Sequence, residues 1–186
     1  MKHIPNLITT LRLLLSFVFL YLFTSANDFA ITIAALIVFC IGAISDALDG
    51  WFARRYRIVS KFGEHYDPLA DKFLTISAFV AFSIMGIVPQ WCVVLIVMRD
   101  VITTILRYAF FTRRHIETSR SAKLKTIVQL VFIIFILVLR IVSETGNSAA
   151  GELLTSDYVF VAMLFVTAIT LWTMVEYIIQ ILGNNE

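Results

Sequence analysis

The sequence predicts an all-α integral membrane protein with six transmembrane helices and both termini in the cytoplasm. Its composition supports the membrane class, because 60% of the 186 residues are hydrophobic and only 15% are charged. The mean hydropathy is +0.89, whereas soluble domains carry about 25% charged residues. The formal net charge of +2 does not favour a nucleic-acid partner. No repeat or change of composition divides residues 1–186, which we expect to form a single membrane domain.

Six apolar stretches predict the six helices. A membrane-spanning helix needs about 20 mostly apolar residues, and only helices or closed barrels satisfy the backbone in lipid. The stretches are continuous and not alternating, which favours helices over barrel strands. The third and fifth are slightly short, and we expect flanking turns to complete them. In chain order the stretches are 7–23, 29–47, 73–88, 91–111, 127–142 and 158–182.

The connections between these stretches predict the orientation. Those at 25–28, 87–90 and 143–157 contain no Lys or Arg, whereas cytoplasmic loops are rich in both. We therefore expect a multi-pass protein of the cell membrane whose basic connections and termini face the cytoplasm. Arg140, near the outer end, is explained by snorkelling. The residues that set this orientation are Lys2, His3, Arg12, Arg54, Arg55, Arg57, Lys61, Arg113, Arg114, Arg120, Lys123 and Lys125.

Four aspartates border the second and third predicted helices. Asp46 and Asp49 are three residues apart, and Asp67 and Asp71 are four apart, so each pair shares one helical face. Because the chain turns back between these helices, we expect the two faces to meet. Clustered carboxylates become stable when they share cations, and oxygen ligands suit Mg²⁺ or Mn²⁺, here up to two ions. The alternative is a set of solvated helix ends that neutralise nearby arginines.

Small and basic residues between the acids fit a ligand that carries phosphate. Gly50 and Ala53 would let a ligand approach the backbone, and Arg54 follows Gly50 by one turn. Gly63 precedes the third aspartate by one turn. This interleaving favours a binding site over a set of isolated surface acids.

The complete pattern resembles a known family signature. Asp46-x2-Asp49-Gly50-x2-Ala53-Arg54-x8-Gly63-x3-Asp67-x3-Asp71 is similar, at all eight fixed positions, to the signature of the CDP-alcohol phosphatidyltransferase family. The resemblance implies six transmembrane helices, with the signature joining the second and third. It implies the transfer of a phosphatidyl or similar group from a CDP-linked donor to an alcohol, with release of CMP. It also implies a homodimer.

The resemblance further implies roles for single residues. The metal ligands would be Asp46, Asp49, Asp67 and Asp71. Asp71 would also be the general base that takes the proton from the attacking hydroxyl, a role that suits a nearby carboxylate. The cytidine diphosphate site would be lined by Asn6, Gly50, Ala53, Arg54 and Gly63.

Further segments resemble the branch of the family that uses glycerol 3-phosphate as acceptor. They are Ile4-Pro5-Asn6-x2-Thr9-x2-Arg12, Asp67-Pro68-Leu69-Ala70-Asp71-Lys72, and Arg99-Asp100 followed by Arg107 and the segment 119–126. Arg99, Thr103 and Arg107 also repeat every four residues in an apolar helix, where charged residues are functional candidates. Converging Arg and Lys side chains can bind phosphate. The predicted ligands of the acceptor phosphate are Lys72, Arg99, Arg107, Arg120 and Lys125.

The sequence therefore predicts transfer of a phosphatidyl group from CDP-diacylglycerol to glycerol 3-phosphate at a site that faces the cytoplasm. Several alternatives stay open. Arg99 could pair with Asp100 or Glu176 for packing alone. The dipeptide Arg99-Asp100 also occurs in the branch whose acceptor is phosphatidylglycerol, and inositol phosphate is a third acceptor. A divalent-cation transporter is the remote alternative, although the acids gather at one predicted face only.

Overall fold

The computed structural model describes the backbone of residues 4–26, 28–56, 63–110 and 120–183, and the side chains of residues 10–26, 28–45, 72–106 and 124–181. Every element of the described backbone is a helix, which confirms the all-α prediction. The elements are α1 (Ile4–Thr24), α2 (Phe29–Tyr56), α3 (Gly63–Ile84), α4 (Gln90–Phe110), α5 (Arg120–Glu144), α6 (Ser148–Leu154) and α7 (Asp157–Gly183).

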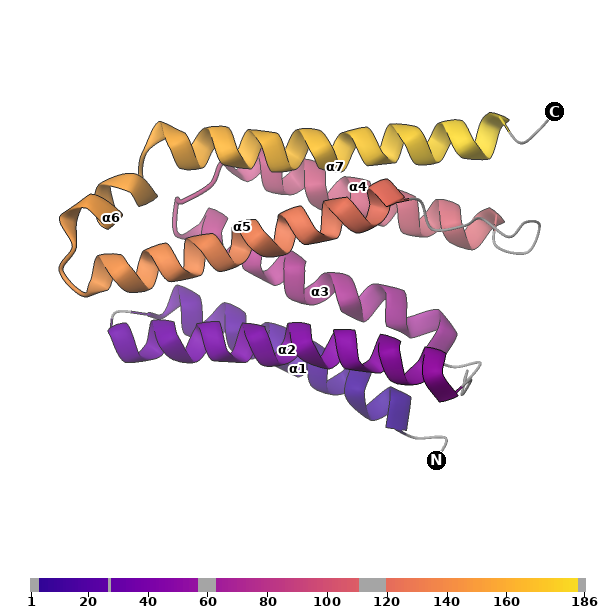
Figure 1. Cartoon of the computed structure of the whole chain (residues 1–186), viewed down its shortest axis with the longest axis horizontal. Helices are drawn as coiled ribbons and strands as arrows, with labels where there is room; N and C mark the ends of the chain where they lie inside the picture. Colours follow the sequence, from indigo (N-terminus) through magenta and orange to yellow (C-terminus); the bar gives the residue numbers. More distant parts are fainter. Residues whose placement is uncertain (1–3, 27, 57–62, 111–119, 184–186) are drawn as a thin grey trace.

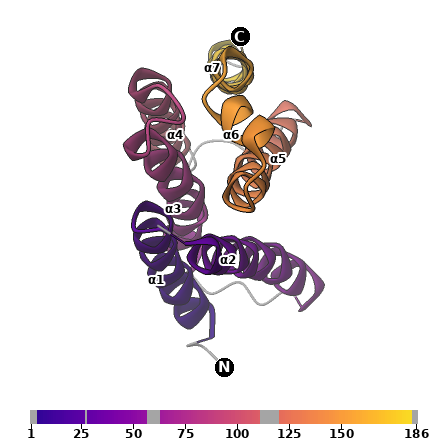
Figure 2. The same ribbon diagram turned by 90° about the vertical axis from the view of Figure 1, so that its left-hand side faces the viewer.

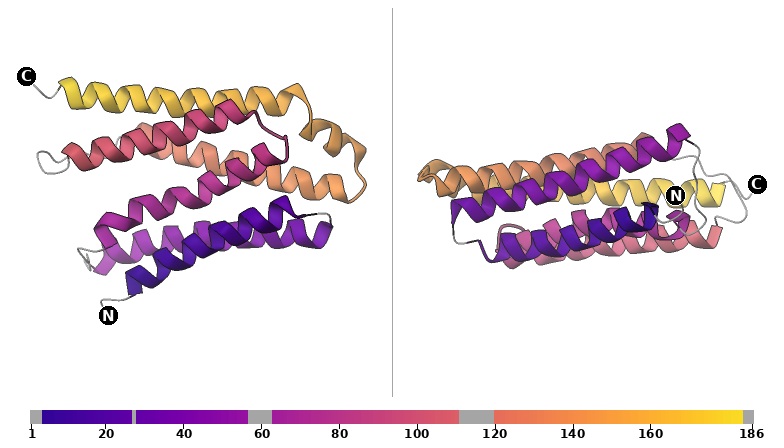
Figure 3. Two further views of the ribbon diagram at one scale, coloured as in Figure 1. Left: turned by 180° about the vertical axis from the view of Figure 1, so that it is seen from behind. Right: turned by 90° about the horizontal axis from the view of Figure 1, so that it is seen from below.

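The six long helices run back and forth along the long axis of the molecule (Figure 1). The start of α1 and the end of α7 lie at one end, together with the end of α2 and the start of α3 (Figures 1 and 3). We call this the signature end. The opposite end, the α6 end, carries α6 and the connections α1–α2 and α3–α4. Viewed along the bundle, α5 lies between α2 and α7 (Figure 2), and it contacts both of them as well as α3.

Four of the six helices contain the predicted apolar stretches in full, whereas α3 ends at Ile84 and α4 at Phe110, before their stretches end. At the signature end, α1, α2, α3 and α5 extend beyond the predicted stretches by three residues or more. The shortest of the six has 21 residues, which span about 31 Å at 1.5 Å per residue, close to the thickness of the hydrocarbon core. By length and apolarity together, two segments of the described residues qualify as membrane spans, Leu124–Glu144 and Asp157–Ile181. Shorter apolar segments lie in α1, α2 and α3. The protein therefore has helices that are apolar enough to cross a membrane, and the count of six spans stays a prediction.

Glycines end two helices at the α6 end. Gly86 and Gly146 have φ values of +72° and +88°, a left-handed conformation that glycine adopts without steric cost. After α3, the Ile87 N–H donates to the Phe82 carbonyl at 2.9 Å and the Gly86 N–H donates to the Ser83 carbonyl at 3.0 Å. This pair of bonds is the Schellman motif. It ends α3 at Ile84, four residues before the end of the apolar stretch.

The segment predicted as an outer connection, 143–157, contains the short helix α6. Asn147 caps it, because its side-chain oxygen accepts the Ala150 N–H at 3.3 Å. Ala150 and Leu154 are buried, and α6 packs against α5. Apolar periodicity could not predict this element, since its seven residues are too few to show a repeat.

The interior divides into an apolar half toward the α6 end and a polar half toward the signature end. Aromatic rings from three helices meet in the apolar half, where the centroids of Phe19 and Phe39 are 5.5 Å apart and those of Phe23 and Phe82 are 5.2 Å apart. The same helices and their neighbours bury polar groups farther along. The buried polar residues in the middle of the bundle and toward the signature end are Arg12, Ser16, Arg99, Asp100, Thr103, Lys125, Gln129, Thr167, Thr170 and Thr173. Thr32 of α2 is a buried polar residue on the apolar side.

Candidate active site

The backbone places the predicted signature on two helices at the signature end. Five of its residues belong to the last three turns of α2, and three belong to the first turns of α3. Their side chains lie outside the described ones, as does that of Asn6 in α1. The residues concerned are Asp46, Asp49, Gly50, Ala53, Arg54, Gly63, Asp67 and Asp71. The helical placement of both acid pairs is confirmed, and their roles stay predictions.

The part of the molecule with described side chains offers no second candidate metal site. Among these, no group of three or more His, Cys, Asp or Glu residues could hold a metal ion. The four signature aspartates offer carboxylate oxygens on adjoining ends of α2 and α3, a donor set that fits Mg²⁺ or Mn²⁺.

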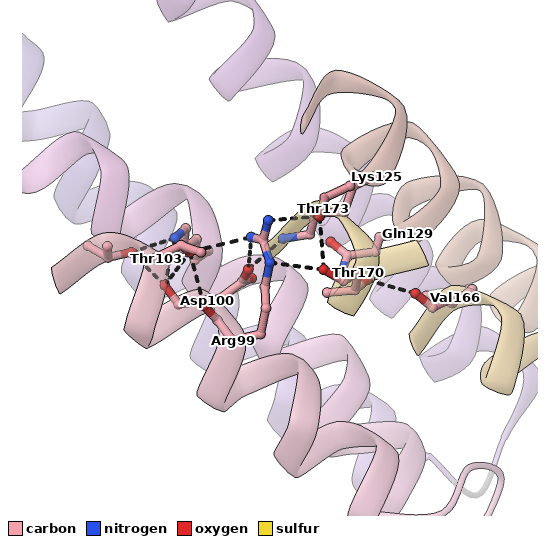
Figure 4. A network of polar contacts seen from close by, with 10 residues as sticks. Arg99, Asp100, Thr103, Lys125, Gln129, Val166, Thr170 and Thr173 are labelled. Carbon is pink, nitrogen blue, oxygen red and sulfur yellow. Dashed lines mark hydrogen bonds and ion pairs between the residues drawn. The ribbon is translucent and has the colours of Figure 1, made fainter. Parts of the chain in front are cut away.

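A buried polar network joins α4, α5 and α7 in the polar half (Figure 4), and Lys72 connects α3 to it. Its centre is Asp100 of α4, whose Oδ1 accepts from Arg99 Nη1 at 2.8 Å and from Lys125 Nζ of α5 at 2.5 Å. Asp100 is 3% exposed, Arg99 7% and Lys125 6%. Buried charges are tolerated when they are paired and hydrogen-bonded. The shared carboxylate therefore lets two cations approach each other inside the bundle.

Arg99 connects this centre to α7. Its Nε donates to the Thr170 carbonyl at 3.1 Å, and its Nη2 donates to Thr173 Oγ1 at 2.8 Å. Its Nη1 also reaches Thr103 Oγ1 at 3.4 Å. Gln129 of α5 donates to the Thr170 hydroxyl at 3.2 Å. The pairing of Arg99 with Asp100, which the sequence leaves open, is thus present in the structure.

Lys72 connects α3 to the same centre. Its Nζ donates to the Asp100 carbonyl at 2.9 Å and to Thr104 Oγ1. Lys72 directly follows Asp71, the predicted base. The network therefore reaches the backbone position next to the signature.

Three of the five predicted acceptor ligands, Lys72, Arg99 and Lys125, meet around one aspartate. The other two, Arg107 of α4 and Arg120 of α5, have side chains outside the described ones. Arg99 and Lys125 share the single carboxylate of Asp100, which leaves an excess positive charge in a buried place. Such an excess attracts an anion, because little water is present to screen it.

Sequence reasoning did not assign several members of this network to the site. They are Asp100, Thr104, Gln129, Thr170 and Thr173. One signal was present, since threonines at positions 167, 170 and 173 form a polar stripe on an apolar helix. The stripe does not show which residue it meets, because that depends on how α4 and α7 pack.

The fold and the site define a class of protein, a helical bundle with membrane-spanning helices, an acidic signature at one end and a buried cationic centre beside it. Residues 2–175 match the family model described as CDP-alcohol phosphatidyltransferase, and the chain belongs to this family. The resemblance predicted from the signature is thereby confirmed.

Curated relatives carry more specific names. The chain is 38% identical over 133 residues to the "probable phosphatidylglycerophosphate synthase" of Mycobacterium tuberculosis strain H37Rv, covering 70% of this chain and 64% of that relative. It is 32% identical over 190 aligned positions to the CDP-diacylglycerol–glycerol-3-phosphate 3-phosphatidyltransferase of Salmonella typhimurium strain LT2, covering 98% and 96%. The protein of that name from Rickettsia typhi is 30% identical, covering 91% and 93%. The chain thus spans less than two thirds of the mycobacterial relative and nearly all of the other two.

Proposed function

We propose that this protein transfers the phosphatidyl group of CDP-diacylglycerol to glycerol 3-phosphate, giving phosphatidylglycerol phosphate and CMP. The observation that carries the proposal is the family signature on α2 and α3 beside a buried cationic centre. Family membership supports the CDP-linked donor, and the names of the relatives support the acceptor.

Each group of residues has a role in this reaction. Mg²⁺ or Mn²⁺ ions, held by Asp46, Asp49, Asp67 and Asp71, would neutralise charge on the donor pyrophosphate. The cytidine diphosphate would lie against Asn6, Gly50, Ala53, Arg54 and Gly63. Asp71 takes the proton of the acceptor hydroxyl, the hydroxyl oxygen bonds to the phosphatidyl phosphorus, and the bond from that phosphorus to the bridging oxygen breaks so that CMP leaves.

The acceptor phosphate would bind where the cations converge. Lys72 and Lys125 supply ammonium groups near Asp100, and Arg107 and Arg120 belong to the same two helices that lead from this centre to the signature end. A dianionic phosphate would balance the excess positive charge of the centre. The nearby signature would then hold the donor and the acceptor together.

The proposal includes an orientation of the protein in the membrane. Six spans with both termini in the cytoplasm would place the signature end at the cytoplasmic face of the cell membrane, because that end carries the basic connections. The acyl chains of the donor would remain among the membrane lipids while its head group enters the polar half. The homodimer is part of this proposal and is drawn from the family resemblance alone.

The test is CMP release by the purified protein in detergent with CDP-diacylglycerol and Mg²⁺. Glycerol 3-phosphate, phosphatidylglycerol and inositol phosphate would be offered separately. We expect release with glycerol 3-phosphate, and a loss of about 10²–10⁴-fold in Asp71→Asn, because general-base catalysis contributes about that much. Chelation of the metal should also stop the release.

Asp28→Asn is the matched control for this test, since Asp28 is exposed at the α6 end, far from the signature. Release only with another alcohol would keep the transferase chemistry and overturn the acceptor. No release with any acceptor, from protein that unfolds cooperatively on heating, would contradict the transferase proposal and favour the transporter alternative.

A further inference from the structure

The donor groups of Arg99 are nearly all used inside the protein. A guanidinium has five N–H donors, and four of them have partners here: one from Nε, two from Nη1 and one from Nη2. These partners lie on α4 and α7. Arg99 therefore acts as a brace between two helices and has little capacity left for a ligand.

Lys125 differs from Arg99 in this respect. An ammonium has three donors, and among the described residues Lys125 Nζ donates only to Asp100 Oδ1. The side chain is 6% exposed, so its remaining donors are not freely hydrated. Lys125 is thus a buried cation with the capacity to bind an anion.

Asp100 contacts cations from three helices. Its carboxylate binds Arg99 and Lys125, and its main-chain carbonyl accepts from Lys72. The formal charge of Arg99, Lys125 and Asp100 is two positive minus one negative, or +1. A phosphate monoester carries a charge of about −1.5 to −2 at pH 7, so a phosphorylated acceptor beside Lys125 would meet a positive charge that Asp100 does not balance.

We propose that Asp100 is a positioning residue of the acceptor site, which holds Lys125 so that this lysine, and not Arg99, meets the acceptor phosphate. This inference rests on the proposed function and separates Arg99 from Lys125, two residues that the sequence treats alike. Lys125 binds the phosphate, Arg99 braces α4 against α7, and Asp100 acts through Lys125.

The test compares three variants in the CMP-release assay. Asp100→Asn removes the charge that holds Lys125, and Lys125→Met removes the ammonium while leaving Asp100 paired with Arg99. Each should raise the KM for glycerol 3-phosphate by about tenfold or more, the usual effect of losing a hydrogen bond to a charged group. The KM for CDP-diacylglycerol should stay within about twofold of the wild-type value. The double variant should be no worse than Lys125→Met, because coupled residues are not additive.

Arg140→Met is the structural control, since it breaks the ion pair with Glu144 at the α6 end and touches neither Lys125 nor Asp100. It should lower the unfolding temperature and leave both KM values unchanged. An unchanged KM for glycerol 3-phosphate in Lys125→Met, or additive effects in the double variant, would overturn the inference. Since Lys125→Met keeps the Arg99–Asp100 pair, it tests the inference even if Asp100→Asn does not fold.

A binding measurement separates this inference from the proposed function. Glycerol 3-phosphate should raise the unfolding temperature of the wild-type protein in Mg²⁺ and CMP, and glycerol should not. Lys125→Met should lose the shift. Binding without CMP release in the wild type would contradict the proposed function and keep the inference. CMP release by the wild type, together with an unaltered temperature shift in Lys125→Met, would support the proposed function and overturn the inference. The absence of a temperature shift in the wild type would also overturn the inference.

Discussion

Arg140 is a charged residue near the α6 end, and it is held by specific partners. Its Nε pairs with Glu144 Oε1 at 2.7 Å, and its Nη2 donates to the Ala26 carbonyl at 3.3 Å. Its guanidinium carbon lies 5.8 Å from the centre of the Phe23 ring. The prediction from sequence was snorkelling, which explains a charge near a helix end. The structure adds that this charge joins α5 to the α1–α2 connection.

We expect Arg140→Met to destabilise the protein. The Glu144 side chain is 18% exposed, so loss of Arg140 leaves a half-buried carboxylate without its charged partner. The expected loss is about 1–3 kcal/mol, measured by thermal unfolding in detergent. Adding Glu144→Gln should recover part of the loss, because no unpaired charge then remains. Full additivity of the two changes would show that the pair does not contribute to stability. CMP release should change little, since the pair lies at the end opposite the signature.

The residues of the site differ in how far the sequence predicts them. The acid pairs are found because helical spacing puts each pair on one face, and the eight-position signature makes the match specific. The basic residues are found by type, but their partners are not. That Arg99 reaches Thr170 while Lys125 shares Asp100 depends on how α4 packs against α7 and where α5 lies in the bundle, which local spacing does not encode.

At the scale of elements, hydropathy predicts where helices are and misses where they end. The stretch 29–47 becomes a helix that continues to Tyr56, and the stretch 127–142 becomes one that begins at Arg120. The part of a helix that lies in lipid must be apolar. Backbone hydrogen bonding does not depend on side-chain polarity, so a helix can continue through polar residues beyond the lipid. The stretch 73–88 shows the opposite case, since Gly86 stops α3 inside an apolar run.

Gly86→Ala tests this helix end. A Cβ at Gly86 would meet no atom within 4 Å, so the cost comes from the positive φ alone. We expect a loss of about 1 kcal/mol in the free energy of unfolding. Gly151→Ala is the matched control, because Gly151 lies inside α6 and its added Cβ would make an ordinary contact with Ser143 at 3.9 Å. That change should raise stability by about 0.5 kcal/mol. Equal effects of the two changes would contradict the explanation by positive φ.

At the scale of the whole molecule, the bundle has two chemically different ends. The sequence predicts this from the charge of the connections, and the structure brings the two termini and the signature to one end. The division of the interior is a separate finding. It arises because polar residues occupy the middle of α4 and α7 and the first described turns of α5, and only the packing of these helices shows that these parts coincide.

Thiol labelling in intact cells tests the orientation. In a background of Cys40→Ala and Cys92→Ala, we expect Thr155→Cys to react with a membrane-impermeant reagent, because Thr155 is exposed beside α6. A cysteine added after Glu186 should react only after the cells are lysed. Cysteines that both react in intact cells would contradict the proposed cytoplasmic termini.

The brace between Arg99 and α7 has a consequence for how the chain is made. Placing a charged side chain at the centre of an isolated helix costs about 2.5–3.5 kcal/mol at insertion, and α4 carries Arg99 and Asp100 together. The groups that satisfy them come later in the chain, Lys125 on α5 and then Thr170 and Thr173 on α7. In the proposed six-span topology, newly inserted α4 would lack its full set of partners until the last helix has been synthesised. The polar half would then assemble late in biogenesis, and a nascent chain without α7 would leave Arg99 without its Thr170 and Thr173 partners.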